Sequence, residues 1–88
     1  MNQIQLQAKM DLLTISAALE GAAVTSIRFQ TEEEAEEVGW HARPIVICFD
    51  NGTEVWATRD PEGNGPGCIE VKQPKSGFLL GAPVPRNL

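Results

Sequence analysis

The chain has 88 residues, of which 42% are hydrophobic and 22% charged, and its formal net charge at pH 7 is −5. This length supports a single core, so we expect one domain at residues 1–80 and an extended tail at 81–88. Seven lysines and arginines against twelve acidic residues argue against nucleic-acid binding. The sequence contains neither an apolar run of roughly 20 residues nor a signal-peptide pattern, which predicts a cytoplasmic protein with no membrane contact.

A core of this size leaves a thin margin of stability, so additional burial in a homodimer would help the fold. Cys48 and Cys68 lack the spacing of a zinc ligand pair or a C-x-x-C redox motif. We interpret both as reduced, small core residues, and the sequence predicts no cofactor.

The first segment has two interpretations. Hydrophobic and polar residues alternate over residues 4–10, as in a half-buried strand, but the same residues can begin a helix. From Asp11, a good N-cap, the spacing of hydrophobic residues predicts a helix over 12–20 that Gly21 closes in a left-handed conformation.

A strand and a short helix are predicted next. Residues 23–30 are rich in β-branched and aromatic side chains, which favours a strand. Thr31 and Glu34 have the spacing of a capping box, so we expect a helix at 32–38, ended by Gly39.

The clearest local pattern is a β-hairpin. Residues 45–49 form a short apolar run, which predicts a central strand buried on both faces. Asp50-Asn51-Gly52 can supply the turn, and residues 53–58 return in extended form. Within this second strand, Trp56 points to the face opposite its two neighbours.

Two more extended segments, at 68–72 and 78–80, complete the pattern. The sequence therefore predicts an α+β fold: a mainly antiparallel sheet of about four strands, with an N-terminal helix packed on one face and a short helix at 32–38.

Residues 60–67, with the sequence DPEGNGPG, are the least ordinary segment. Glycines raise the entropic cost of ordering a loop, so three glycines indicate a backbone shape, or a close approach to a ligand, that other residues would prevent. Two prolines restrict the unfolded chain and favour a loop of defined shape.

The run DNGTEVWATRDPEGNGPG resembles short uncharacterised bacterial proteins, in which a hairpin closed by D-N-G-T or D-D-G-T leads into S/T-R-D-x-E-G-N-G-P-G. Those proteins also place Gly-Trp before the hairpin, as Gly39-Trp40 does here. The likeness covers roughly the middle half of the chain. It implies no particular activity, ligand or partner.

Asp60, Glu62 and Asn64 alternate like the first three ligands of a calcium loop, with Gly65 at the turn position. The position that must supply a bidentate glutamate is occupied by Val71, however, and the flanking segments are predicted strands. We therefore predict no metal site there and interpret the three oxygen-bearing residues as turn formers.

These features predict a non-enzymatic binding module that presents loop 60–67 to an unknown protein or small ligand. The candidate binding residues are Trp56, Arg59, Asp60, Glu62, Asn64 and His41. Arg59 can pair with a neighbouring carboxylate or clamp a carboxylate or phosphate of a ligand.

Two alternatives remain. The first is a small metal-dependent or hydrolase-like enzyme, in which His41, the sole histidine, acts as a base with Asp60 and Glu62. The second is an acidic decoy for a basic protein partner, which would use the five glutamates within residues 32–37. The same glutamates also suit the exposed first turns of a helix.

Overall fold

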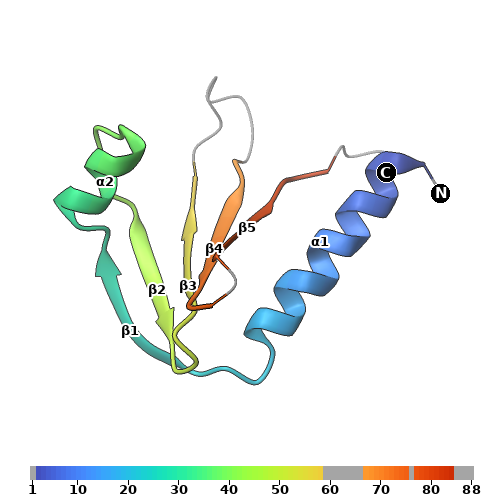
Figure 1. The fold of residues 1–88 in the computed structure, drawn as a ribbon, viewed down its shortest axis with the longest axis horizontal. Helices are drawn as coiled ribbons and strands as arrows, with labels where there is room; N and C mark the ends of the chain where they lie inside the picture. The colour runs from blue at the N-terminus through green and yellow to red at the C-terminus, as the bar shows by residue number, and fades with distance from the viewer. Residues whose placement is uncertain (1, 59–66, 76, 85–88) are drawn as a thin grey trace.

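The structure is a computed structural model, and it describes residues 2–58, 67–75 and 77–84. Consecutive strands pair antiparallel in the order β1-β2-β3-β4-β5, so the sheet is a simple meander (Figure 1). The elements in chain order are α1 (Gln3–Leu19), β1 (Val24–Phe29), α2 (Glu32–Val38), β2 (Ile45–Phe49), β3 (Glu54–Ala57), β4 (Ile69–Gln73) and β5 (Gly77–Gly81).

The predicted α+β architecture is confirmed, with five strands in place of about four. The last strand, β5, contains the segment predicted at 78–80, and it pairs with β4 along its whole length. Beyond it, residues 82–84 form neither helix nor strand.

The turn at Asp50-Asn51-Gly52 connects β2 to β3 as predicted, and it also holds the preceding part of the chain. The Asn51 side chain accepts a hydrogen bond from the Thr53 amide at 3.0 Å and donates one to the Ala18 carbonyl of α1 at 2.9 Å. Asp50 exchanges two hydrogen bonds with the backbone of Ala23, at 2.8 and 3.1 Å. The hairpin turn therefore fixes the connection between α1 and β1.

The two faces of the sheet differ in chemistry, because alternate residues of a strand point to opposite sides. Face A carries an apolar row that crosses all the strands: Ile27, Ile47, Val55, Val71 and Leu79. Face B carries the neighbouring row: Arg28, Val46, Trp56, Glu70 and Leu80.

Each helix lies against a different face of the sheet. Ala18 of α1 belongs to a buried cluster with Val55 and Val71, and further α1 side chains pack around it, which places the predicted N-terminal helix on face A. On the other side, α2 is linked to face B through Arg28. Figure 1 shows α1 beside β5, and α2 near β1 and β2.

The prediction for the start of α1 was wrong. The helix begins at Gln3, where Asn2 and Gln5 form a capping box, and Asp11 lies in its interior. The Asp11 carboxylate accepts a hydrogen bond from the Gln7 side chain at 2.8 Å. It therefore makes a side-chain contact along the helix and does not cap the helix N-terminus. Good local capping at Asn2 outweighs the alternating pattern of residues 4–10.

The prediction for residues 45–49 was also wrong in part. The central strand is β3, and β2 is not buried on both faces, since Ile45 is 54% exposed. The cause is that α1 packs over Val55 and Val71 towards β5, and on β2 its cluster includes Phe49 but not Ile45. The capping box at Thr31 and the left-handed Gly39 of α2 are confirmed, whereas Cys48 and Cys68 are half-buried free thiols and not full core residues.

Among the residues that the structure describes, neither helix has the length and apolar character that crossing a lipid bilayer requires.

Gly52 offers a test of the turn. It has φ +83°, and a Cβ at this position would lie 2.6 Å from Cγ of Pro74. We expect Gly52→Ala to lower the free energy of unfolding by about 2 to 3 kcal/mol, because backbone strain and a steric clash add together. Gly21→Ala is the matched control: φ is +79° with no atom within 4 Å, so strain alone should cost about 1 kcal/mol. Urea unfolding measures both, and equal losses would contradict the contact with Pro74.

Candidate functional site

Two hydrogen-bonded residues, Thr58 and Cys68, lie just beyond the ends of β3 and β4, and we call them the stem. Thr58, after β3, donates its amide hydrogen to the Cys68 carbonyl at 2.8 Å. The Cys68 amide in turn donates to the Thr58 hydroxyl at 3.0 Å. The antiparallel pairing of β3 and β4 is therefore extended beyond Ala57, and the position of the stem is fixed.

The connection between α2 and β2 lies at the same end of the sheet. Gly39 ends α2 with φ 73°, and its amide bonds back to the helix. The Trp40 amide donates to the Ala35 carbonyl at 2.9 Å, and the Pro44 carbonyl accepts from the Gln30 amide at 2.8 Å. Both ends of this connection are thus held by backbone hydrogen bonds.

The stem and the connection border one hollow of about 540 Å³, called the end hollow here. It is lined by Gly39, Trp40, His41, Ala42, Arg43, Pro44, Ala57 and Thr58. A smaller neighbouring hollow of about 320 Å³ shares Trp40, His41 and Arg43 and adds Glu32, Ala35 and Glu36 of α2. Residues that are distant in sequence therefore converge because β2 begins where β3 ends.

The chemistry of the end hollow suits recognition of an anionic or planar group. Arg43 and His41 are exposed, and Trp40 is half-buried. A guanidinium can bind a carboxylate or phosphate through two hydrogen bonds, and an indole can stack on a planar group. The described lining of the end hollow includes no aspartate or glutamate, whereas Glu32 and Glu36 line the neighbouring hollow that shares His41 and Arg43.

Trp56 lies elsewhere. It is a buried residue of face B, its indole Nε1 donates to a carboxylate oxygen of Glu70 at 2.6 Å, and its ring meets Phe78 edge-on with 6.0 Å between ring centroids. It lines a different hollow, of about 280 Å³, together with residues of α2 and β4. The structure therefore does not bring Trp56 and His41 into one site.

Four of the sequence-predicted binding residues, Arg59, Asp60, Glu62 and Asn64, lie outside the described residues. Within the described ranges, no group of three histidines, cysteines or acidic residues has the geometry of a metal site. Sequence reasoning missed Trp40, Arg43 and Thr58. The hairpin register could have revealed Thr58, because pairing of Val46 with Trp56 places residue 44, at the end of the connection, opposite residue 58.

The hollow over face B contains one unusual polar group. Gln30 is only 4% exposed, and its side-chain oxygen has no hydrogen-bond partner among the described residues. It lines the hollow beside Trp56, and the other lining residues include Glu37 and Lys72. Acidic, basic and aromatic side chains are mixed there, so the lining does not select one ligand chemistry.

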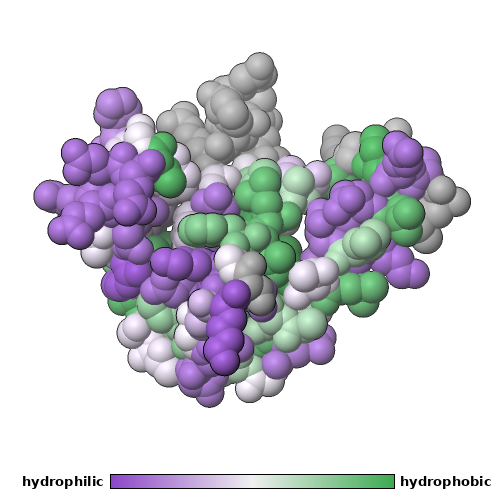
Figure 2. Space-filling model, viewed as in Figure 1, coloured by the Kyte–Doolittle hydropathy of each residue, from purple (hydrophilic) through white to green (hydrophobic). Residues whose placement is uncertain are grey.

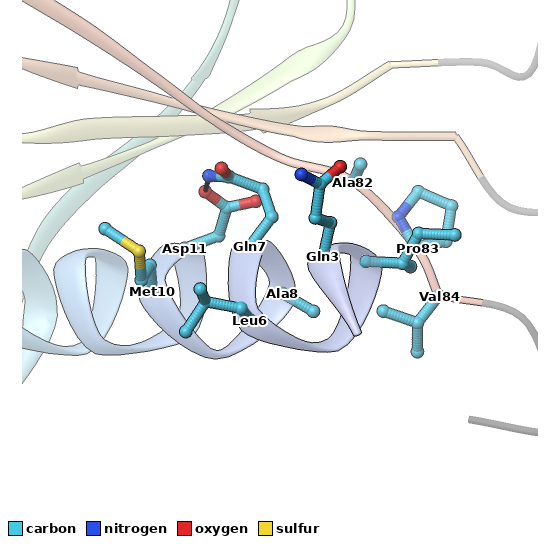
Figure 3. A pocket seen from close by; sticks show the side chains of 10 residues that line it. Gln3, Leu6, Gln7, Ala8, Met10, Asp11, Ala82, Pro83 and Val84 are labelled. Atoms are coloured by element: carbon cyan, nitrogen blue, oxygen red, sulfur yellow. Dashed lines mark hydrogen bonds between the residues drawn. The ribbon is translucent and has the colours of Figure 1, made fainter. Parts of the chain in front are cut away.

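A further hollow of about 540 Å³ lies between the first half of α1 and residues 82–84 (Figure 3). The close-up shows Leu6, Met10 and Val84 among its lining side chains. Its carboxylate, Asp11, is already hydrogen-bonded to Gln7. This surface is mostly apolar and presents no reactive group among the described residues.

An ion-pair network holds α2 on face B. The Arg28 guanidinium donates to both carboxylate oxygens of Glu34, at 2.8 and 3.2 Å, and to Glu54 at 2.9 Å. The hydrogen bond from Arg28, supported by one from the Thr31 backbone, lowers the pKa of Glu34 to about 2. The two carboxylates raise the pKa of Arg28 above its usual value.

Comparison of the chain with protein-family models, with curated protein sequences and with solved structures finds no match.

The Arg28 network predicts a specific dependence of stability on pH. Because the pKa of Glu34 falls from 4.5 to about 2 on folding, the ionised carboxylate stabilises the fold fully above pH 4.5, and this contribution is lost as the pH falls towards 2. We expect Glu34→Gln to cost about 1 kcal/mol near neutral pH, a value reduced by the partial exposure of both partners. The difference from the unmodified protein should shrink between pH 4.5 and 2.

The control for this measurement is Glu33→Gln, an exposed position in the same helical turn. Urea unfolding at a series of pH values should show little change for this variant. A pH-independent loss in Glu34→Gln would show that the ion pair does not hold α2.

Proposed function

We propose that this protein is a small non-enzymatic binding module whose ligand contacts the end hollow and the glycine-rich loop 60–67. The observation that carries the proposal is the convergence of residues 39–44 with Ala57 and Thr58 around one concave surface. The glycine-rich loop 60–67 follows Thr58 in the chain after one residue, Arg59, and the proposal includes both of these segments. The setting that we propose is the cytoplasm.

The chemistry of the hollow favours a ligand with a carboxylate or phosphate group, carried either by a small molecule or by a segment of a protein. The Arg43 guanidinium can donate two parallel hydrogen bonds to such a group, and His41 can donate another. Trp40 adds an aromatic surface in the same lining. Binding sites commonly combine a mostly apolar lining with a few polar groups of this kind.

Binding is favoured over catalysis because the described lining of the end hollow offers His41 no carboxylate and no free hydroxyl, and the glutamates that share a hollow with His41, Glu32 and Glu36, line the neighbouring one. The hydroxyl in this lining belongs to Thr58, and it is already engaged with Cys68. A histidine that acts as a base needs a nucleophile or a water to deprotonate, and a second group commonly orients its ring. The enzymatic alternative thus depends on Asp60 and Glu62.

A second candidate is an interaction with a basic protein through α2. Glu32, Glu33, Glu36 and Glu37 are exposed, while Glu34 is committed to Arg28. Four exposed carboxylates on one short helix create a local negative field that attracts a cationic partner. Such binding would weaken steeply with added salt, whereas binding in the end hollow would respond to salt only moderately.

The two tryptophans provide the test of the proposed function. We expect inorganic phosphate, nucleotides or a short peptide with a free carboxyl terminus to shift the indole NH signal of Trp40 in NMR spectra, because Trp40 lines the end hollow. The signal of Trp56 should stay in place, since its indole is bonded to Glu70. Calcium, magnesium and zinc, added separately, test the metal-dependent alternative.

Arg43→Gln should weaken binding of the responsive probe at least about tenfold, the loss expected for a charge-assisted hydrogen bond. Lys9→Gln, which removes a positive charge from α1, should leave the affinity unchanged. If none of the probes, nor an added fractionated cell extract, shifts the backbone amide signals of residues 39–43, 57 and 58, the end hollow is not the binding site.

A further inference from the structure

A hollow on face B contains a buried polar atom without a hydrogen-bond partner. It is the hollow of about 280 Å³ that Gln30 and Trp56 line, and we call it the face-B hollow. Gln30 is 4% exposed, and no described residue donates a hydrogen bond to its side-chain oxygen. A buried acceptor that lacks a donor destabilises a fold. A ligand that donates a hydrogen bond in this hollow would therefore satisfy Gln30.

The face-B hollow lies between α2 and the strands. Glu37 and Val38 line it from α2, and the remaining wall comes from β3, β4 and β5. In Figure 2, hydrophilic side chains concentrate on α2, at the left, while hydrophobic ones gather over the middle of the molecule. A ligand in the hollow is thus bordered by a polar helix on one side and by the sheet on the other.

The composition of this lining leaves the ligand open, but the contacts of its members narrow the choice. The Trp56 indole donates to Glu70 at 2.6 Å, and the Lys72 ammonium lies over the Phe78 ring, 6.0 Å from its centre. These two donors are therefore engaged within the protein, whereas the Gln30 oxygen is not. The group that the hollow lacks is a donor.

The charges around the face-B hollow favour a cationic donor. The lining includes the three carboxylates of Glu34, Glu37 and Glu70 and one cation, Lys72. Arg28 pairs with Glu34, but Glu54 shares the same guanidinium. Carboxylates thus outnumber cations among these residues, and such an excess attracts a positive group and repels an anion.

The aromatic side chains narrow the class of cation. Phe78 is 64% exposed and meets the buried Trp56 edge-on, and the position of Lys72 shows that a cation can lie against the Phe78 ring. A guanidinium is planar, stacks on aromatic rings and carries five N–H donors. It is also less strongly hydrated than an ammonium, so it is more easily brought into a small hollow.

We propose that the face-B hollow binds a guanidinium group, which donates hydrogen bonds to the Gln30 oxygen and the Glu37 carboxylate and lies against Phe78. This site is separate from the proposed function, because the face-B hollow and the end hollow have no described lining residue in common. An arginine side chain of a partner protein and a free guanidino compound share this chemistry.

NMR titrations of the full chain at constant ionic strength test the proposal. Methylguanidinium should shift the ring signals of Phe78 and the indole NH signal of Trp56, whose acceptor Glu70 lines the hollow. N-methylurea, a neutral molecule of the same shape, should bind at least about tenfold more weakly because it lacks the charge. The Trp40 signal should stay in place, since Trp40 lines the end hollow.

A capped tripeptide with a central arginine separates the two sources of the group. Tighter binding of the tripeptide than of methylguanidinium assigns the group to a partner protein, and the reverse order assigns it to a small molecule. Either order supports recognition of a guanidinium.

Three variants test the roles of single side chains. Gln30→Met removes the oxygen at similar size and should weaken methylguanidinium binding about tenfold, without loss of stability in urea unfolding because no described hydrogen bond to that oxygen is lost. Gln73→Met is the matched control: Gln73 does not line the hollow, so the affinity should stay unchanged. Lys72→Gln removes a competing cation and should tighten binding about threefold, whereas it would weaken binding of an anion.

The proposal is overturned if methylguanidinium leaves the Trp56 and Phe78 signals in place, or if N-methylurea binds equally well. Unchanged affinity in Gln30→Met would overturn it too, and so would a loss of stability in this variant, which would show that the oxygen already has a structural partner. The end hollow is tested separately by anionic probes and the Trp40 signal, so either site can fail without the other.

Discussion

The structure depends on the turn at Asp50-Asn51-Gly52, because its side chains add hydrogen bonds to α1 and to the start of β1 beyond the strand pairing and the packing of the helix. Asn51 reaches the last turn of α1, and Asp50 holds the residue before β1. Gly52, in turn, lies against Pro74 of the connection between β4 and β5. One tight turn thus sets the positions of the first helix, the first strand and the last hairpin.

At the opposite end of the strands, the position of α2 depends on Arg28. A single guanidinium bridges a helix residue and a strand residue, Glu34 and Glu54, and so fixes a helix of seven residues that could not be stable alone. The connection that follows α2 carries Trp40, His41 and Arg43 into the end hollow. The site is thus positioned by one ion-pair network and by the start of β2.

Local signals predicted local structure well. The capping box at Thr31, the left-handed Gly39 and the hairpin turn depend on residues close in sequence, and each has a strong stereochemical cause. The start of α1 was missed because alternation over residues 4–10 imitates a strand, while the cap at Asn2 is a single-residue signal. Exposure of Ile45 could not be predicted, because it depends on where α1 packs.

The candidate site was predicted only in part for a similar reason. His41 was identified as a chemically distinctive residue, but Arg43 and Thr58 are ordinary in sequence and become neighbours only through strand pairing. Trp56 was placed near the site by its position in the chain, yet the alternation of side chains along β3 directs it to face B, towards Glu70 and Phe78. Residues that are close in sequence on one strand can therefore lie on opposite faces of the sheet.

The closed stem at Thr58 and Cys68 has a consequence for how this protein can change. Because the sheet is already sealed by hydrogen bonds below residues 59–66, replacing or lengthening that segment adds only a small closure entropy, about 0.6 kcal/mol for each doubling of length. Thr58 and Cys68, which make these hydrogen bonds, lie outside that segment. Substitutions and insertions in it should therefore leave the β3–β4 pairing in place.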